Sequence, residues 1–120
     1  MLYSIEDKSP ISNIPHAQHY NLIRSRLSQQ EFNAITDAIN SVFNGVEVQC
    51  ASFIPGAEWE GTPYMPLYEN VASGDFELAA KLFGLMVWVT LLNRQDTWSF
   101  GRYPLTGRDI EGMTYFRVDI

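Results

Sequence analysis

The sequence predicts an α+β fold in one domain, with a small antiparallel sheet packed on one amphipathic helix and one long buried helix. Three observations predict this class. Apolar residues recur at helical spacing within 28–43, an almost unbroken apolar stretch fills 75–94, and strand-like segments lie on both sides of that stretch. Because no repeat and no Ser/Gly/Pro-rich run divides the chain, we expect a single domain, 1–120.

Residues 1–27 are predicted to form an irregular N-terminal arm. They hold Pro10 and Pro15 among serines, asparagines and scattered apolar residues. Proline fixes φ and removes an amide donor, so long regular elements are disfavoured in this arm. We expect only one short turn of helix, around 16–22.

The first helix is predicted to begin after Ser28. Ser28 and Glu31 form a capping-box pattern, in which the hydroxyl accepts an N–H of the first turn and the carboxylate accepts the N–H of Ser28. The apolar positions that follow at helical spacing are Phe32, Ile35, Ile39, Val42 and Phe43. Asn44 and Gly45 then supply a left-handed stop.

A strand and a long loop are expected next. From Val46 to about Phe53, apolar residues alternate with polar or small ones, which is typical of a strand with one covered face. Residues 54–69 contain three prolines and two glycines, which break helix and strand alike. The large apolar side chains of this loop are Trp59, Tyr64, Met65 and Tyr68. A loop so rich in aromatic rings either packs on the core or lines a binding site.

The second helix is predicted to start at 73–75 and to run to about Arg94. Beyond Lys81 its apolar residues cover all sides, so it must be surrounded by sheet, by the first helix or by a second subunit. Gly84 in its middle costs about 1 kcal/mol against alanine and indicates the close approach of another backbone. The apolar run 82–92 is well short of the roughly 20 residues that a bilayer span needs, so we expect no membrane partner.

The C-terminal part combines a predicted hairpin with a group of arginines. Two strands, 98–103 and 113–118, are expected on either side of a turn region, 104–112. The net charge of −6 opposes non-specific binding to nucleic acid, which depends on lysine and arginine. Yet four of the eight cations lie in the last 27 residues: Arg94, Arg102, Arg108 and Arg117. A local anion site on an acidic protein fits this distribution.

Three side-chain patterns bear on metal or catalytic chemistry, and each favours a structural role. His16 and His19 have an acceptable ligand spacing, but nothing completes a tetrahedral metal set. Cys50 lies on the covered face of the predicted strand, where thiols are usually inert. Glu58 and Glu60 flank a tryptophan, as carboxylates do in some glycoside-cleaving sites, but neighbouring loop carboxylates are more often solvated. We therefore predict no metal, no cofactor and no catalytic set.

The residues that best fit a binding site lie on the second helix and the hairpin: Phe83, Asn93, Trp98, Arg102 and Arg108. A purine base can stack on an aromatic ring while an asparagine reads its edge, and arginines hold phosphates bidentately. These residues predict a purine-nucleotide pocket without catalytic groups. In the alternative interpretation both aromatic rings belong to the core, and the arginines pair with Asp96, Asp109 and Glu111.

Residues 68–98 read YENVASGDFELAAKLFGLMVWVTLLNRQDTW, which is about a quarter of the chain. The Tyr-Glu pair, the helix with Phe and Gly at its centre and Asn near its end, and the Asp-x-Trp that follows resemble phage-encoded sponge proteins of the Thoeris anti-defence family. Members of that family sequester cyclic ADP-ribose-type messengers made by bacterial TIR enzymes, and some also take cyclic oligonucleotides. They bind these ligands in pockets of a homo-oligomer and cleave nothing.

The resemblance implies that Phe83 and Asn93 hold the adenine and that an arginine of the C-terminal hairpin holds the phosphates. Three arginines remain open for that role: Arg102, Arg108 and Arg117. The chain departs from the family in the loop, where it has Glu58 and Glu60 and no arginine.

We therefore expect a non-catalytic phage anti-defence protein that sequesters a nucleotide immune messenger as a homo-oligomer. The single cysteine, Cys50, and a start without a basic and apolar signal predict the cytoplasm of a host bacterium. Two alternatives stay open. One is an acidic inhibitor of the anti-CRISPR or immunity type, which docks its acidic surface and the loop around Trp59 and Tyr64 on a basic target. The other is a small hydrolase that uses Glu58 or Glu60.

Overall fold

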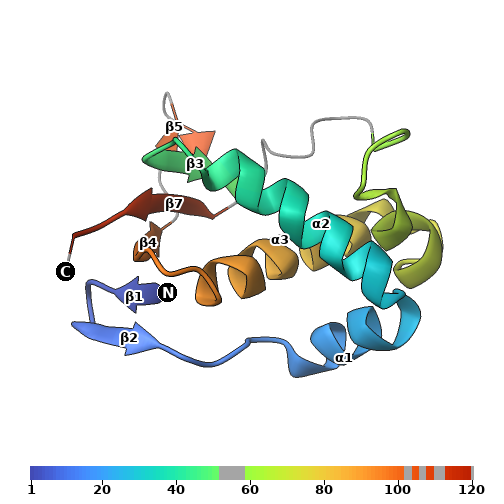
Figure 1. The fold of residues 1–120 in the computed structure, drawn as a ribbon, viewed down its shortest axis with the longest axis horizontal. Coiled ribbons are helices and arrows are strands. Elements are labelled where there is room, and N and C mark those ends of the chain that lie inside the picture. Colours follow the sequence, from blue (N-terminus) through green and yellow to red (C-terminus); the bar gives the residue numbers. More distant parts are fainter. Residues whose placement is uncertain (52–58, 102–103, 106–107, 110–112, 120) are drawn as a thin grey trace.

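The computed structural model describes residues 1–51, 59–101, 104–105, 108–109 and 113–119. In chain order, its elements are β1 (Leu2–Ser4), β2 (Ser9–Ile11), α1 (Ala17–Arg26), α2 (Gln29–Phe43), β3 (Val48–Cys50), the π-helix η2 (Leu67–Val71), α3 (Phe76–Leu92), β4 (Trp98–Gly101), β5 (Pro104–Leu105), β6 (Arg108–Asp109) and β7 (Thr114–Arg117). The strands gather at one end of the molecule, and α3 leads from the helical part into β4 (Figure 1). This arrangement confirms the predicted α+β class.

The main sheet has five strands in the order β2-β1-β4-β7-β3. The pairings of β1 with β2, β4 with β7 and β7 with β3 are antiparallel, as predicted. The pairing of β1 with β4 is parallel, with Leu2 beside Trp98, so the prediction of a purely antiparallel sheet is wrong. The difference arises because the N-terminal segment lies beside β4, where the Trp98 N–H donates to the Met1 carbonyl at 2.9 Å.

The N-terminal arm is more regular than the sequence predicts. β1 and β2 form a hairpin at the edge of the sheet, and the helical turn expected around 16–22 belongs to α1, which has ten residues. Pro10 lies opposite Tyr3 in this hairpin. An edge strand tolerates a residue without an N–H, so proline does not prevent the strand here. Lys8 turns the hairpin with a positive φ of 54°.

The capping box at the start of α2 is confirmed. The Glu31 N–H donates to the Ser28 hydroxyl at 3.0 Å, and the Ser28 N–H donates to the Glu31 carboxylate at 2.9 Å. The helix packs on α3 through its apolar side. The buried residues of that side are Ile35, Ile39 and Phe43. Gly45 follows the helix with a φ of 91°, as the predicted left-handed stop requires.

The segment predicted as a loop ends in the first residues of the short π-helix η2, which runs on to Val71. The Ala72 N–H donates to the Leu67 carbonyl at 2.8 Å, an i+5 bond that widens the turn. Leu67 and Val71 are buried, and η2 packs on α1 and α3. Pro66 precedes η2 with a helical φ of −58°, so this proline starts a helical turn and does not break one.

The helix α3 is central to the molecule, and nine of its 17 residues are buried (Figure 1). The Asp75 carboxylate accepts the Leu78 N–H at 3.2 Å and caps its first turn. Apart from Gly84, its two chain neighbours and the backbone of the adjacent turns of α3, no described atom lies within 4 Å of the place that a Cβ would take at Gly84. The close backbone approach expected at this glycine is therefore not found in the described part of the chain. None of the described helices is long and apolar enough to cross a bilayer.

The C-terminal hairpin is confirmed, with Trp98 opposite Arg117 and Gly101 opposite Thr114 across β4 and β7. At the far end of this hairpin, β5 and β6 add a separate two-stranded sheet. At the near end, the Val118 N–H donates to the Thr97 carbonyl at 3.0 Å. The pairing thus brings the last residues of the chain next to the segment that follows α3.

Candidate functional site

The two aromatic rings predicted to hold a base, Phe83 and Trp98, both lie in the core. Phe83 is 2% exposed, and its ring packs edge-on against Tyr64 at 4.9 Å. Trp98 is 0% exposed, and its ring packs edge-on against Phe43 at 5.0 Å. Neither ring has an open face on which a base could stack. Both rings are core residues, as the alternative interpretation of the sequence expected.

Asn93 lies at the end of α3 and is exposed. Its Nδ2 donates to the Val89 carbonyl at 2.9 Å, which leaves the amide oxygen available for a ligand. It follows Phe83 by ten positions, which at ~1.5 Å per helical residue is roughly 15 Å along the axis. Within one copy of the chain the two residues are therefore far apart along α3, and an adenine between them would need Phe83 and Asn93 of different copies.

The predicted hairpin arginines are placed only in part. Arg102 lies outside the described residues, and Arg108 is placed by its backbone in β6, opposite Leu105. Of the two loop carboxylates, Glu58 lies outside the described residues and Glu60 is exposed.

The two histidines considered as metal ligands lie together, whereas the cysteine lies on a different element. The His16 and His19 rings stack at 5.9 Å at the start of α1, and Cys50 is placed by its backbone in β3. Within the described part of the chain, no group of three or more His, Cys, Asp or Glu side chains is arranged to hold a metal ion.

Arg94 organises the end of α3, a role that the sequence did not predict. Its guanidinium donates to both carboxylate oxygens of Asp96, at 2.8 and 2.9 Å. It also donates to the side-chain oxygens of Asn40 on α2 and of Asn44, the C-cap of α2, each at 2.9 Å. We call these four residues the Arg94 network. The Arg-x-Asp spacing just after the helix was a signal for the pair with Asp96, but the contacts to α2 depend on the tertiary fold.

The Asp96 carboxylate is held in its ionised form. The hydrogen bonds from Arg94 hold the pKa of the Asp96 carboxyl below its ordinary value of 3.8, and burial opposes them only in part. The Trp98 indole N–H lowers this pKa further, although it lacks the geometry of a formed hydrogen bond. Asp96 therefore acts as a hydrogen-bond acceptor at neutral pH and does not supply a proton.

The N-terminal ammonium group fixes the same region. The amino group of Met1 donates to the carbonyls of Leu91, Arg94 and Asp96 at 2.7, 2.6 and 2.8 Å. Carbonyls at a helix C-terminus lack partners within the helix and favour a positive charge. Burial nevertheless lowers the pKa of this amine below 8.0, against the raising effect of Asp96. β1 is thus tied to the end of α3 as well as to β4.

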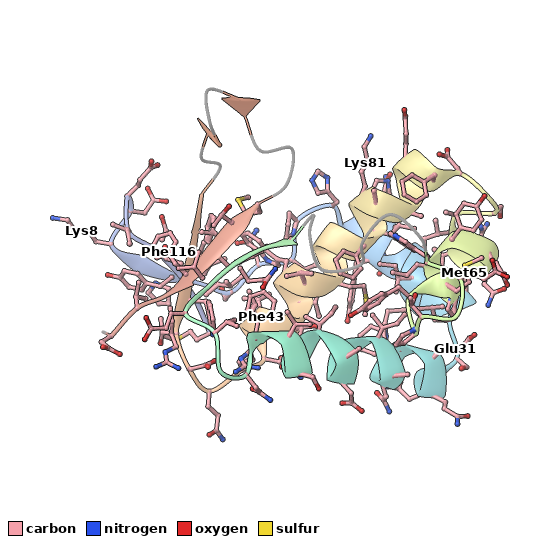
Figure 2. The ribbon with its side chains drawn as sticks, turned by 90° about the horizontal axis from the view of Figure 1, so that it is seen from above. Lys8, Glu31, Phe43, Met65, Lys81 and Phe116 are labelled. Carbon is pink, nitrogen blue, oxygen red and sulfur yellow. The ribbon has the colours of Figure 1, made fainter. Side chains whose placement is uncertain are left out.

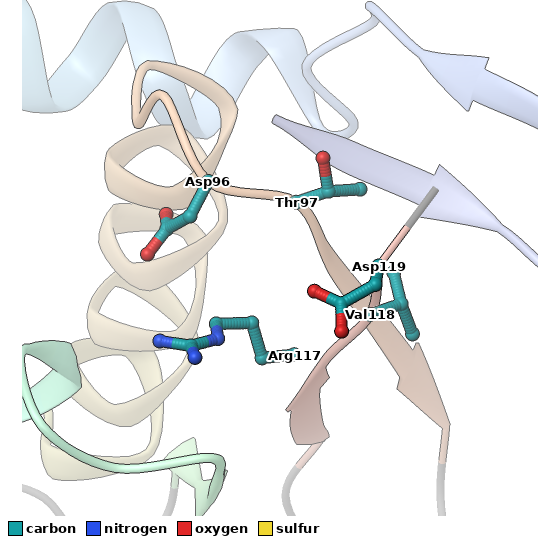
Figure 3. Close-up of a pocket in the computed structure, with 5 residues that line it drawn as sticks. All are labelled: Asp96, Thr97, Arg117, Val118 and Asp119. Carbon is teal, nitrogen blue, oxygen red and sulfur yellow. The ribbon is translucent and has the colours of Figure 1, made fainter.

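An open hollow of about 580 Å³ lies beside the Arg94 network. It is lined by Asp96, Thr97, Arg117, Val118 and Asp119 (Figure 3). Figure 3 shows the Arg117 side chain extending from β7 toward α3, with the Asp96 side chain above it. Arg117 is exposed, and its guanidinium makes no ion pair within 4.0 Å with a described carboxylate. The hollow therefore offers an available guanidinium between two carboxylates.

This set of groups selects a ligand with two kinds of chemistry. A guanidinium binds phosphate or carboxylate through two parallel hydrogen bonds. The carboxylates of Asp96 and Asp119 disfavour an anion that carries nothing else, but they accept hydrogen bonds from hydroxyl and amino groups. A nucleotide combines these features, because it joins phosphates to ribose hydroxyls and an exocyclic amine.

Comparisons with known proteins give no match for this chain. No protein-family model, no curated protein and no solved structure matches it.

Proposed function

We propose that the protein is a phage anti-defence protein that binds and sequesters a nucleotide immune messenger without cleaving it. The ligand is a cyclic ADP-ribose isomer or a related cyclic oligonucleotide. The observation that carries the proposal is the available Arg117 guanidinium in the hollow beside ionised Asp96. The proposal includes a homo-oligomer that acts in the cytoplasm of a host bacterium.

Arg117 is the phosphate contact in this proposal. Other described arginines are engaged within the fold: Arg26 donates to the Val71 carbonyl at 3.0 Å, and Arg24 lies 4.2 Å from the centre of the Phe32 ring. Arg94 is occupied by its network. Arg117 was one of the three hairpin arginines that the family resemblance left open, and it lines the hollow.

The carboxylates of the hollow account for selectivity in this proposal. Asp96 and Asp119 would accept hydrogen bonds from the ribose hydroxyls or the adenine amino group, while repelling free phosphate or pyrophosphate. A messenger-binding protein needs this selectivity, because inorganic phosphates are abundant competitors in a cell.

Binding without cleavage is consistent with the state of Asp96. A general acid needs a pKa near the working pH, whereas Arg94 lowers the pKa of this carboxyl below 3.8. The two contacts from Arg94 also hold the carboxylate in place. These properties suit a fixed acceptor for a ligand better than they suit proton transfer.

The test is a melting-temperature scan of the purified protein against cyclic ADP-ribose isomers, cyclic dinucleotides and cyclic trinucleotides, with pyrophosphate as the control anion. A ligand at 100 times its dissociation constant stabilises the folded state by about 2.7 kcal/mol, which raises the melting temperature measurably. We expect a shift with a nucleotide, none with pyrophosphate, and the ligand recovered intact after heat denaturation. An altered ligand would indicate an enzyme, and no shift with any nucleotide would contradict the proposal.

A further inference from the structure

The segment that joins η2 to α3 lies at the end of the molecule opposite the sheet (Figures 1 and 2), and five aromatic rings from this segment and its neighbours contact one another. We call this cluster the aromatic corner, and its members are Trp59, Tyr64, Tyr68, Phe76 and Phe83. The ring of Phe76 lies 5.6 Å from that of Trp59 and 6.4 Å from that of Tyr68. Phe83 contacts both Trp59 and Tyr64 from inside the core. The corner thus extends continuously from the core to the surface.

The outermost ring of the aromatic corner is open to solvent. Phe76 is 51% exposed, although Trp59 beneath it is only 5% exposed. A half-exposed phenylalanine that continues a buried aromatic cluster provides apolar area that a partner can cover without unfolding anything.

Four carboxylates are chain neighbours of rings in the aromatic corner. Glu60 follows Trp59, Glu69 follows Tyr68, and one carboxylate lies on each side of Phe76 in the chain. The four residues are Glu60, Glu69, Asp75 and Glu77. All four are exposed, and none forms an ion pair within 4.0 Å with a described cation. The described charged residues next in the chain to these rings are therefore all acidic, and the nearest cation along α3 is exposed Lys81, one turn after Glu77.

Two further features of this corner are uncommon in folded proteins. Ser73 has a φ of 53°, in the turn where the Gly74 N–H donates to the Tyr68 carbonyl at 2.8 Å. The buried indole N–H of Trp59 has no hydrogen-bond acceptor in the described part of the chain.

We infer that the aromatic corner docks a basic segment of a partner protein, with an arginine of that segment placed on Phe76. Ring faces and carboxylates both attract cations, and a guanidinium can stack on a ring while it donates to a carboxylate. A nucleic acid would be repelled by the four carboxylates. The surface lies at the other end of the molecule from the Arg117 hollow, so this inference stands apart from the proposed ligand site.

The test is a selection of displayed random dodecapeptides on the full-length protein, followed by affinity measurement of the selected peptides. We expect arginine-rich peptides whose affinity falls at least tenfold between 50 and 300 mM salt, because charge attraction is screened. Phe76→Ala should weaken their binding at least tenfold. Ile5→Ala is the matched control, since Ile5 is also 51% exposed and should leave binding unchanged.

A second pair of variants tests the charges separately. Replacing Glu69 and Glu77 together by glutamine should weaken the binding of the selected peptides at least tenfold. The same change at Glu6 and Glu47 is the control, because it removes equal charge from exposed positions outside the corner and should leave peptide binding unchanged. Melting temperatures of all variants check that the fold is retained. Three results would overturn the inference: no selected peptides, peptides without basic residues, or equal binding by the parent and Phe76→Ala.

Discussion

At the scale of single residues, Arg94 and Arg117 show how neighbours decide what an arginine does. Arg94 meets two asparagines of α2 and one carboxylate, so its donors are used within the fold. Arg117 lies on β7, opposite Trp98 of β4. Its side chain lines the hollow and pairs with no described carboxylate. The sequence contains both residues in the same arginine-rich region, and only the fold separates the structural role of Arg94 from the binding role that we propose for Arg117.

The ion pair of Asp96 with Arg94 predicts how stability depends on acid. The pKa of Asp96 is lower in the folded state than its ordinary value of 3.8, so the stabilisation is present above that value. It is lost as the pH falls below 3.8 toward the lowered pKa. Asp96→Asn should therefore be less stable than the parent at pH 7, with a gap that narrows below about pH 3.8. Urea unfolding between pH 2.5 and 7 measures the difference in the free energy of unfolding between the parent and Asp96→Asn. A difference that stays constant over this range would contradict the prediction.

At the scale of elements, the predictable parts are those fixed by local sequence. α2 follows from a capping box within four residues and from apolar spacing along a single helix. The π-helix η2 was not predictable, because Leu67 and Val71 are placed by packing on other helices. The parallel pair of β1 with β4 was missed for a similar reason, since it joins residues almost a whole chain apart.

The capping box gives a prediction for α2. Ser28→Ala removes the hydroxyl that accepts the Glu31 N–H at 3.0 Å and should lower the free energy of unfolding by about 1 kcal/mol. Ser41→Ala is the control, because Ser41 is an exposed residue inside the same helix and only donates to the Asp37 carbonyl. Denaturant unfolding compares the two variants. Equal effects would mean that the capping box contributes nothing beyond the helix propensity of alanine.

At the scale of the whole molecule, the candidate site could be predicted only in part. Helical spacing already separates Phe83 from Asn93 by roughly 15 Å within one copy, so the sequence alone could show that the implied adenine pair needs two copies of the chain. The hollow could not be predicted, because it forms where the segment after α3 meets the end of β7. Arg117 was identified as one of three possible phosphate contacts, but Asp96 and Asp119 were not identified as its neighbours.

The fold separates two surfaces of different chemistry. The Arg117 hollow lies beside the sheet, and the aromatic corner lies at the opposite end of α3 (Figure 1). Because the two surfaces share no residue and lie toward opposite ends of α3, variants at one surface should leave the other unaffected. Arg117→Ala should therefore keep the affinity of peptides selected on the aromatic corner. Loss of peptide binding in that variant would show that the two surfaces are coupled.

The most direct test of the central claim is calorimetric titration of the nucleotide that gives the largest melting shift, into the parent, Arg117→Ala and Arg24→Ala. Arg24 is the control, because it is also exposed but lies on α1. Loss of a charge-assisted contact costs roughly 1.5–3 kcal/mol, so Arg117→Ala should bind at least tenfold more weakly while Arg24→Ala binds like the parent. Equal affinity of the parent and Arg117→Ala would contradict the proposal that Arg117 holds the phosphates of a sequestered messenger.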